Sequence, residues 1–343
     1  MRSLLFGSVI AALVLAAAVW ASGHAVEKKP KNVILIGWDG AGRKNIKEGL
    51  AAGELPNLKK LAGQGSLVGI DILRQTDTKA GWTQILTGYE PENTGVFSNT
   101  LYKPIPRGYS VFERLEKYFG PKNIVTAAVI SKTIHMEGEG PKKEPIGGAE
   151  LKKLEKKCAM GYDEKKLVYE DGEAFAITPA KPYHTTREGM DVFINGLKKD
   201  KAVGAMAMEL LQKYKAKPFF FFVHFGDADS RGHTFGEGSQ QYRDAIISAD
   251  TWTGKIMDKL EELNLYDDTL IYVTADHGFD TGKRKHRDAP YVFLATNDKT
   301  IIRKGERADI APTMLERFGI DLDGIDPPLD GYPLSEPMKT NNW

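Results

Sequence analysis

The sequence predicts an α/β protein with a mostly parallel central sheet and helices on both faces. Short apolar runs alternate with helical patterns from Asn32 onward, and this alternation is typical of a parallel sheet. Most of the runs are unbroken in apolar character, as in strands that are covered on both faces. The chain has 343 residues, of which 41% are hydrophobic and 27% charged. This composition excludes a disordered or collagen-like chain.

The predicted strands and helices follow one another along the chain. We expect strands at Val33–Ile36, Leu67–Ile72, Ile124–Ile130, Phe219–Phe225, Leu270–Thr274 and Tyr291–Leu294. We expect helices at Pro56–Gln64, Val111–Tyr118, Ala202–Tyr214 and Tyr242–Leu263. Pro56 fits the first turn of its helix, because the N–H that proline lacks would have no partner there inside the helix. In the longest helix Ile246, Trp252 and Ile256 fall on one face, which indicates an amphipathic helix.

Residues 135–198 show a different pattern. The segment is rich in Lys, Glu, Gly and Pro, and its apolar periodicity is weak. We interpret it as an insertion or cap on a single main domain that spans residues 26–343. The alternative is a long solvated excursion that has no role in substrate choice.

The first 25 residues have the layout of a secretory signal. Arg2 precedes an apolar run from Leu4 to Trp20, and small residues follow between Ala21 and Ala25. We therefore expect residues 1–25 to be a cleaved signal peptide. The mature protein would then be exported, either periplasmic or secreted, without a stable membrane span. The alternative is an uncleaved membrane anchor, since the apolar run lies at the short limit for a span.

Charge and cysteine content narrow the possible functions. Lys plus Arg number 47 and Asp plus Glu number 46, so no electrostatic footprint for nucleic acid is evident. The single cysteine, Cys158, excludes an internal disulfide and those metal sites that need several thiolates. A metal ion in this chain must therefore be held by Asp, Glu and His.

Polar side chains follow the carboxyl ends of the predicted strands. They are Asp39 after the first strand, Lys132 after the third, Asp229 and His233 after the fourth, and Asp276 and His277 after the fifth. Open α/β sheets bind ligands at this edge. Asp229 and His233 are four residues apart, a spacing that brings both to one cation if the loop begins a helix. Together with His286, these carboxylates and imidazoles suit zinc or manganese at two neighbouring sites.

A polar loop and the start of a short helix, within residues 76–88, offer a nucleophile. A hydroxyl at a helix N-terminus meets the positive end of the helix dipole and free backbone N–H groups. The alternative is that Thr76 or Thr78 only caps the helix. From the residues alone, the capping interpretation is the simpler one.

In combination these motifs resemble the alkaline phosphatase superfamily. The motifs are WDG at 38–40, LPNLKKLAGQG at 55–65, LTGYEPENTGV at 86–96, DADSRGH at 227–233, ADHG at 275–278 and RADIAPTMLERFGI at 307–320. The resemblance spans most of residues 32–335 and is nearest the nucleotide pyrophosphatase/phosphodiesterase branch. It implies an alkaline-phosphatase-like fold. It also implies hydrolysis of a small-molecule phosphate ester, at a phosphodiester or pyrophosphate bond.

The resemblance implies two divalent metal ions, either zinc or, as the alternative, manganese. One ion would lie on Asp229, His233 and His286, and the other on Asp39, Asp276 and His277. Thr78, beside the second ion, would be the nucleophile that forms a covalent phospho-threonine. Asn99 would hydrogen-bond a nonbridging phosphoryl oxygen, and Lys132 would neutralise another.

Several departures from the relatives keep other functions open. Lys79-Ala80-Gly81-Trp82 stands where phosphodiesterases commonly have Phe-Pro-Asn-His, and an arginine that accompanies the lysine of some monoesterases is absent. Thr78 cannot provide the formylglycine of sulfatases, although Lys132 and His135 resemble the Lys and His of a sulfatase loop. The alternatives are a sulfatase or phosphonate hydrolase, a phosphomonoesterase, and a non-catalytic periplasmic metal-binding protein. We expect Trp82 and the 135–198 segment to shape the substrate pocket.

Overall fold

The computed structural model of the chain describes residues 30–160 and 165–337. The predicted signal peptide, residues 1–25, lies outside this range. An eight-stranded sheet forms the centre, with the strand order β11-β2-β10-β9-β1-β8-β3-β7. Its strands are β1 (Asn32–Trp38), β2 (Ser66–Asp71), β3 (Val125–Ile130), β7 (Val192–Asn195), β8 (Phe219–Phe225), β9 (Thr269–Thr274), β10 (Tyr291–Thr296) and β11 (Gly305–Glu306). Neighbouring strands are parallel except at β10, which runs antiparallel to both β9 and β2.

The α-helices of the main body are α1 (Arg43–Ala51), α2 (Pro56–Gln64), α3 (Thr78–Thr87), α4 (Pro91–Thr94), α5 (Val111–Phe119), α7 (His184–Glu188), α8 (Asp200–Tyr214), α9 (Asp227–Phe235), α10 (Gln240–Glu262) and α11 (Ile310–Arg317). Short 3₁₀ turns lie at η1 (Thr133–His135), η2 (Tyr266–Asp268) and η3 (Arg307–Asp309). All four helices and all six strands expected from the sequence are present, with ends that differ by a few residues.

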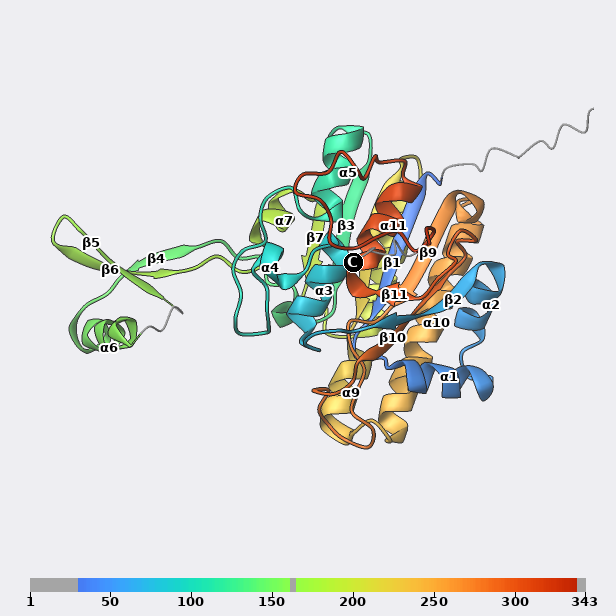
Figure 1. The fold of residues 1–343 in the computed structure, drawn as a ribbon, viewed down its shortest axis with the longest axis horizontal. Helices are drawn as coiled ribbons and strands as arrows, with labels where there is room; N and C mark the ends of the chain where they lie inside the picture. Colours follow the sequence, from blue (N-terminus) through green and yellow to red (C-terminus); the bar gives the residue numbers. More distant parts are fainter. Residues whose placement is uncertain (1–29, 161–164, 338–343) are drawn as a thin grey trace, which may run out of the picture.

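Two adjacent residues of β1 show that helices cover both faces of the sheet. Trp38 donates a hydrogen bond to Thr253 of α10, at 3.2 Å. A Cβ on Gly37 would lie 2.4 Å from the Trp82 ring of α3. Because successive strand residues point to opposite faces, α10 and α3 cover opposite faces of the sheet (Figure 1). The predicted mostly parallel sheet with helices on both faces is confirmed.

Trp82 belongs to the core and does not line an open pocket. Its side chain is fully buried between Gly37 and the rings of Phe222 and His224. The expectation that Trp82 shapes the substrate pocket is therefore wrong. Trp82 follows the candidate nucleophile closely in the sequence, which suggests that its ring faces the substrate. In the structure, Gly37 on β1 makes room for the ring beneath the site.

The 135–198 segment contains two structurally different parts. The strands β4 (Lys142–Pro145), β5 (Lys166–Glu170) and β6 (Glu173–Thr178) form a separate antiparallel sheet with α6 (Gly148–Ala159). This unit, which we call the arm, extends away from the main sheet in Figure 1. The flanks of the segment belong to the main body: β7 pairs with β3, and the η1 turn lies at the site described below. Cys158 lies in the arm as a free thiol.

In the two described stretches, no helix combines the length and the apolar character that a membrane crossing requires.

Candidate active site

The site lies at the carboxyl edge of the main sheet. Asp39 directly follows β1, whereas one residue separates Lys132 from the end of β3 and one residue separates the Asp276–His277 pair from the end of β9. Helix α9 begins just after β8 and carries Asp229 and His233. Parallel strands have their carboxyl ends at the same edge of a sheet, and the side chains named above therefore lie close together at that edge.

Asp229, His233 and His286 form a first group that could hold a metal ion. Because Asp229 and His233 lie one turn apart on α9, they share a face of that helix. His233 Nε2 lies 3.2 Å from Asp229 Oδ1, and its other ring nitrogen lies 2.9 Å from the carbonyl oxygen of Arg284. If Nδ1–H donates to that carbonyl, Nε2 keeps the lone pair that a metal needs.

A second group contains Asp39, Asp229 and His277. His277 Nε2 lies 3.4 Å from Asp39 Oδ1, 3.5 Å from Asp276 Oδ2 and 3.8 Å from Asp229 Oδ1. The three residues expected to hold the second ion, Asp39, Asp276 and His277, are therefore neighbours. Asp229 lies between the two groups and contributes to both.

Thr78 lies against the second group. It is the first residue of α3, is buried, and places Oγ 3.1 Å from His277 Nε2. The residue at the N-cap position of α3 is Asp77, so neither threonine takes that position. Thr76 lies beside the first group instead: its hydroxyl donates to the backbone carbonyl of His286 and lies 3.4 Å from Nδ1 of the same residue. Of the two threonines, Thr78 is the one whose hydroxyl lies against His277 and the second group.

Asn99 packs against the start of α3. Its Oδ1 accepts the backbone N–H of Lys79 at 3.0 Å, and its own backbone N–H donates to Asp77 Oδ1 at 2.9 Å. The first bond fixes the orientation of the side-chain amide, and the second holds the backbone of Asn99 against the start of α3. With Oδ1 engaged, Nδ2 remains as the hydrogen-bond donor of an exposed side chain beside Thr78.

Lys132 forms an ion pair with Asp229 Oδ2. Burial opposes its charge, but the Asp39 and Asp229 carboxylates outweigh that effect and raise the pKa of Lys132. The ammonium group therefore stays charged and is engaged with a metal-ligand candidate in this structure.

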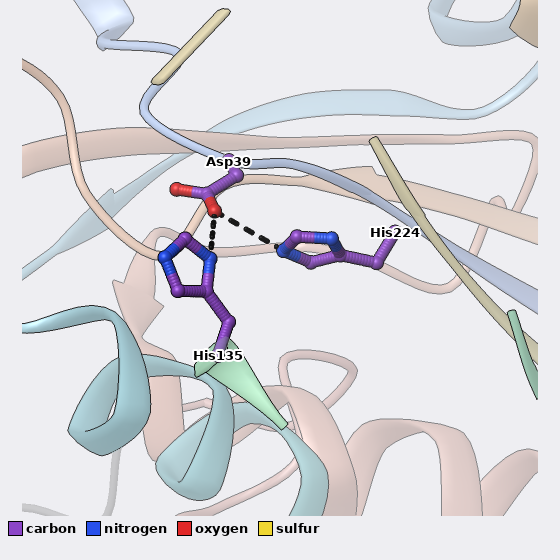
Figure 2. Close-up of side chains that lie close together, drawn as sticks. All are labelled: Asp39, His135 and His224. Atoms are coloured by element: carbon purple, nitrogen blue, oxygen red, sulfur yellow. Dashed lines mark ion pairs between the residues drawn. The ribbon is translucent and has the colours of Figure 1, made fainter. Parts of the chain in front are cut away.

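His135 and His224 complete the surroundings of Asp39, and sequence reasoning did not assign them to this position. Figure 2 shows both rings directed toward the Asp39 carboxylate. Asp39 Oδ2 lies 2.7 Å from His135 Nδ1 and 3.2 Å from His224 Nε2, and the three residues form a third group that could hold a metal ion. One signal was available for His224, which interrupts the otherwise apolar strand FFFFVHF. In the sequence, His135 stands out only through its likeness to the His of a sulfatase loop.

The electrostatics of the site suit bound cations. Burial raises the pKa of Asp276 well above its usual value, and the nearby Asp39 and Asp229 carboxylates raise it further. Burial and Asp39 also oppose ionisation of Asp229, but His233 and Lys132 outweigh them and lower its pKa to about 2. Burial and His286 lower the pKa of His277 to about 4, so its ring is neutral at pH 7 and able to bind a metal.

Buried carboxylate oxygens without a hydrogen bond indicate whether metal ions fit at this site. Both oxygens of Asp39, Oδ1 of Asp229 and Oδ2 of Asp276 are buried and accept no hydrogen bond of good geometry. The nitrogens beside them belong to the imidazoles of His135, His224, His233 and His277, at 2.7–3.5 Å. Buried polar atoms are normally paired, and an ionised carboxylate in particular needs a positive partner. Carboxylate oxygens beside neutral imidazoles are ligands that zinc and manganese accept. The residues present therefore fit divalent cations.

Comparison with known proteins identifies the family of this chain. Residues 33–323 match the sequence profile of the type I phosphodiesterase / nucleotide pyrophosphatase family. The chain belongs to this family. The resemblance seen in the sequence motifs is confirmed, and the matched range includes every residue of the two predicted metal groups.

Curated relatives and solved structures add detail. The human ectonucleotide pyrophosphatase/phosphodiesterase family member 1 is 29% identical over 118 residues, which cover 31% of this chain and 12% of the relative. The chain therefore spans only a small part of that relative.

Two solved structures share the fold. A protein in the alkaline phosphatase superfamily from Vibrio parahaemolyticus superposes with a TM-score of 0.56 at 18% identity, covering 91% of this chain and 71% of that chain. Alkaline phosphatase from the Antarctic bacterium TAB5 superposes with a TM-score of 0.52 at 17% identity, covering 86% of this chain and 99% of that chain. The predicted alkaline-phosphatase-like fold is confirmed.

Proposed function

We propose that this member of the family is an exported two-metal hydrolase of small-molecule phosphodiester or pyrophosphate bonds, acting through a covalent phospho-threonine at Thr78. The observation that carries the proposal is the position of the Thr78 hydroxyl. It lies at the N-terminus of α3, 3.1 Å from His277 Nε2 and beside the buried carboxylates. Membership of the family supports hydrolysis of a phosphoester bond.

The chain's own residues provide two places for divalent ions. Asp229, His233 and His286 would hold one, and Asp39, Asp276 and His277 would hold the other. When bound, two such ions supply the positive charge that lowers the pKa of a coordinated hydroxyl and stabilises the charge of the phosphoryl oxygens. His277 is neutral at pH 7, and its Nδ1 lies 2.9 Å from the carbonyl oxygen of Gly278, which directs the other nitrogen toward the ligand group.

The catalytic step at the protein is a displacement at phosphorus. The Thr78 hydroxyl loses its proton to solvent and its oxygen forms a bond to phosphorus, while the bond to the leaving-group oxygen breaks and the leaving group departs with the electron pair. Water then attacks the phosphorus of the phospho-threonine, the bond between phosphorus and the Thr78 oxygen breaks, and the oxygen takes up a proton. Phosphate monoester or phosphate is released. Asn99 Nδ2 supports this step as a neutral hydrogen-bond donor to a nonbridging oxygen.

The preference for diesters rests on the position of Lys132. A monoester brings one more negative charge than a diester and needs an additional cation. Lys132 is paired with Asp229 Oδ2 and is not available for that role in this arrangement. The absence of an accompanying arginine near Lys132 points in the same direction.

The experiment is a substrate panel with two matched threonine variants. Aryl phosphate monoesters, aryl phosphodiesters, an aryl phosphonate ester and an aryl sulfate are assayed with and without chelator. Wild type should favour the phosphodiester, and Thr78→Ala should lose about 10³-fold or more in kcat/KM. Thr76→Ala removes a hydroxyl that bonds the backbone carbonyl of His286 and lies 3.4 Å from its Nδ1, and it should lose no more than about tenfold.

The panel also contains the results that contradict the proposal. Diester turnover that survives both Thr78→Ala and metal removal rules out the mechanism. If the enzyme turns over the sulfate or the monoester faster than the diester, its substrate class is a sulfate ester or a phosphate monoester and not a phosphodiester. Bound metal with no turnover on any ester indicates a binding protein.

A further inference from the structure

Arg307 lies beneath the site and has no role in the mechanism above. It begins the η3 turn and is 2% exposed. Its Nη1 donates to the backbone carbonyl of Asp276 at 2.9 Å, and its Nη2 donates to the backbone carbonyl of Gln75 at 2.8 Å. Among the described residues, no carboxylate oxygen lies within 4.0 Å of the guanidinium to form a salt bridge.

The two carbonyls belong to the two segments that meet at the site. Asp276 directly precedes His277, and Gln75 lies three residues before Thr78. One segment leaves β9, and the other connects β2 to α3. The two terminal nitrogens of a single planar group therefore connect the segment of the nucleophile to the segment of a metal-ligand pair.

Gly81 makes room for this connection. A Cβ at Gly81 would lie 2.8 Å from Arg307 Nη1 and 2.9 Å from Asp276 Cβ. Glycine inside a helix is less favourable than alanine, and α3 contains one at the point where the guanidinium passes. The absent side chain is thus what lets Arg307 reach both carbonyls.

The charge of Arg307 also suits its surroundings. Burial lowers its pKa to about 10, which leaves the guanidinium charged at pH 7. Asp276, Glu90 and Asp77 act on it in the opposite direction. The cation therefore faces acidic groups at longer range while its hydrogen bonds go to backbone.

We propose that Arg307 is a positioning residue that fixes the spacing between the Thr78 hydroxyl and the Asp276–His277 pair. This inference rests on the proposed function, because it concerns the nucleophile and one metal-ligand pair of that site. Lysine cannot replace arginine in this role, since a single ammonium group cannot span two carbonyls with a rigid planar fork.

The test compares Arg307→Lys with Arg303→Lys as the matched control. Arg303 also donates to backbone carbonyls, those of Glu336, Tyr332 and Pro333, and it pairs with the Asp309 carboxylate at 2.9 Å. None of these partners belongs to the two segments that Arg307 connects. Both variants keep the charge. Kinetics are measured on the metal-loaded enzyme with an aryl phosphodiester, and zinc binding is measured by calorimetry on metal-stripped protein.

The expected result separates the two arginines. Arg307→Lys should lower kcat by about 10²-fold with KM changed less than about threefold, because a displaced nucleophile affects the chemical step more than binding. Its zinc titration should lose affinity in one of two steps. Arg303→Lys should keep kcat and both zinc steps, even if its melting temperature falls.

A second variant approaches the same contact from α3. Gly81→Ala should also lower kcat, because its methyl group would lie 2.8 Å from the guanidinium and 2.9 Å from Asp276 Cβ, so that both must shift. In the double variant, Gly81→Ala with Arg307→Lys, the lysine is shorter and has a single terminal nitrogen, so it clashes less with the new methyl group. The fold loss in kcat should therefore be smaller than the product of the two single losses. If Arg307→Lys does not fold, Gly81→Ala carries the test.

Two results overturn the inference. The first is an Arg307→Lys enzyme whose kcat and zinc titration both match those of Arg303→Lys. The second is a Gly81→Ala enzyme with wild-type kcat. A failure of the proposed function is distinct from these, since wild type would then not turn over phosphodiesters while the zinc titrations would still compare the two arginines.

Discussion

The hydroxyl oxygen of Thr78 lies 3.1 Å from Nε2 of His277, although the two residues are 199 positions apart in the sequence. The contact joins the N-terminus of α3 to the segment that follows β9. It brings a weak nucleophile to a neutral imidazole and to carboxylates with unsatisfied oxygens.

Asp229 should matter to both metal ions, because it belongs to both ligand groups. Wild type should retain about two divalent ions per chain, whereas Asp229→Asn should retain fewer than one and His286→Ala about one. Metal content is measured by mass spectrometry after exhaustive buffer exchange, with the exposed Asp244→Asn as control. Equal metal content in Asp229→Asn and wild type would remove Asp229 from the site.

Much of this site could be predicted from the sequence. Asp39, Asp229, His233, Asp276 and His277 all follow buried strands, and the ends of parallel strands meet at one edge. The His233 placement depended on whether residues 227–235 curl into a helix, and they do.

Other parts could not be predicted, because they depend on contacts between distant segments. His224 lies in β8, and its partner Asp39 directly follows the neighbouring strand β1. The burial of Trp82 depends on Gly37, and the role of Arg307 depends on carbonyls at positions 75 and 276. No local pattern in the chain encodes these pairings.

Asn99→Asp should slow the chemical step while keeping the start of α3 in place. The aspartate still offers an oxygen to the Lys79 N–H, but it replaces the Nδ2 donor with negative charge beside an anionic substrate. We expect kcat to fall by about 10²–10³-fold. The control is Asn123→Asp, on an exposed turn. An unchanged kcat in Asn99→Asp would assign Asn99 a structural role only.

Asp200 should make stability depend on pH. It is buried at the start of α8, and its Oδ1 accepts the N–H groups of Gly226 and Asp227 at 2.8 and 3.1 Å. Burial, with Asp227 adding to it, raises the pKa of Asp200 to about 7. The folded state therefore binds this proton more tightly than the unfolded state, whose carboxyl has a pKa of about 3.9. The stabilisation is complete below about pH 4 and is lost as the pH rises through about 7.

Asp200→Asn removes this titration and keeps an oxygen for the two N–H groups. Its free energy of unfolding relative to wild type should rise between pH 4 and pH 8 by an amount on the order of a few kcal/mol. Urea unfolding at both pH values measures it, and the exposed Asp258→Asn should show no such trend. A pH-independent difference for Asp200→Asn would refute the assignment.

The arm should be dispensable for folding. Its elements pack mainly on one another, and its two ends meet where Lys142 pairs with Thr178. Replacing residues 142–178 with a short Gly-Ser linker should change kcat/KM for a small aryl phosphodiester by less than about threefold, since the linker closes the same short gap. Thermal unfolding and kinetics check both points. If the variant without the arm folds but loses activity, the arm acts as a cap over the substrate.

The covalent intermediate tests the central claim most directly. Metal-loaded wild type is mixed with an aryl phosphodiester or monoester, quenched in acid within the first turnover, and analysed by intact mass and peptide mapping. The account predicts a protein that is heavier by one phosphoryl group with the monoester, or by one phosphoryl group that keeps the second ester substituent with the diester. The added group should lie on Thr78 and be absent from Thr78→Ala. Turnover without any covalent adduct, or an adduct on another residue, would contradict it.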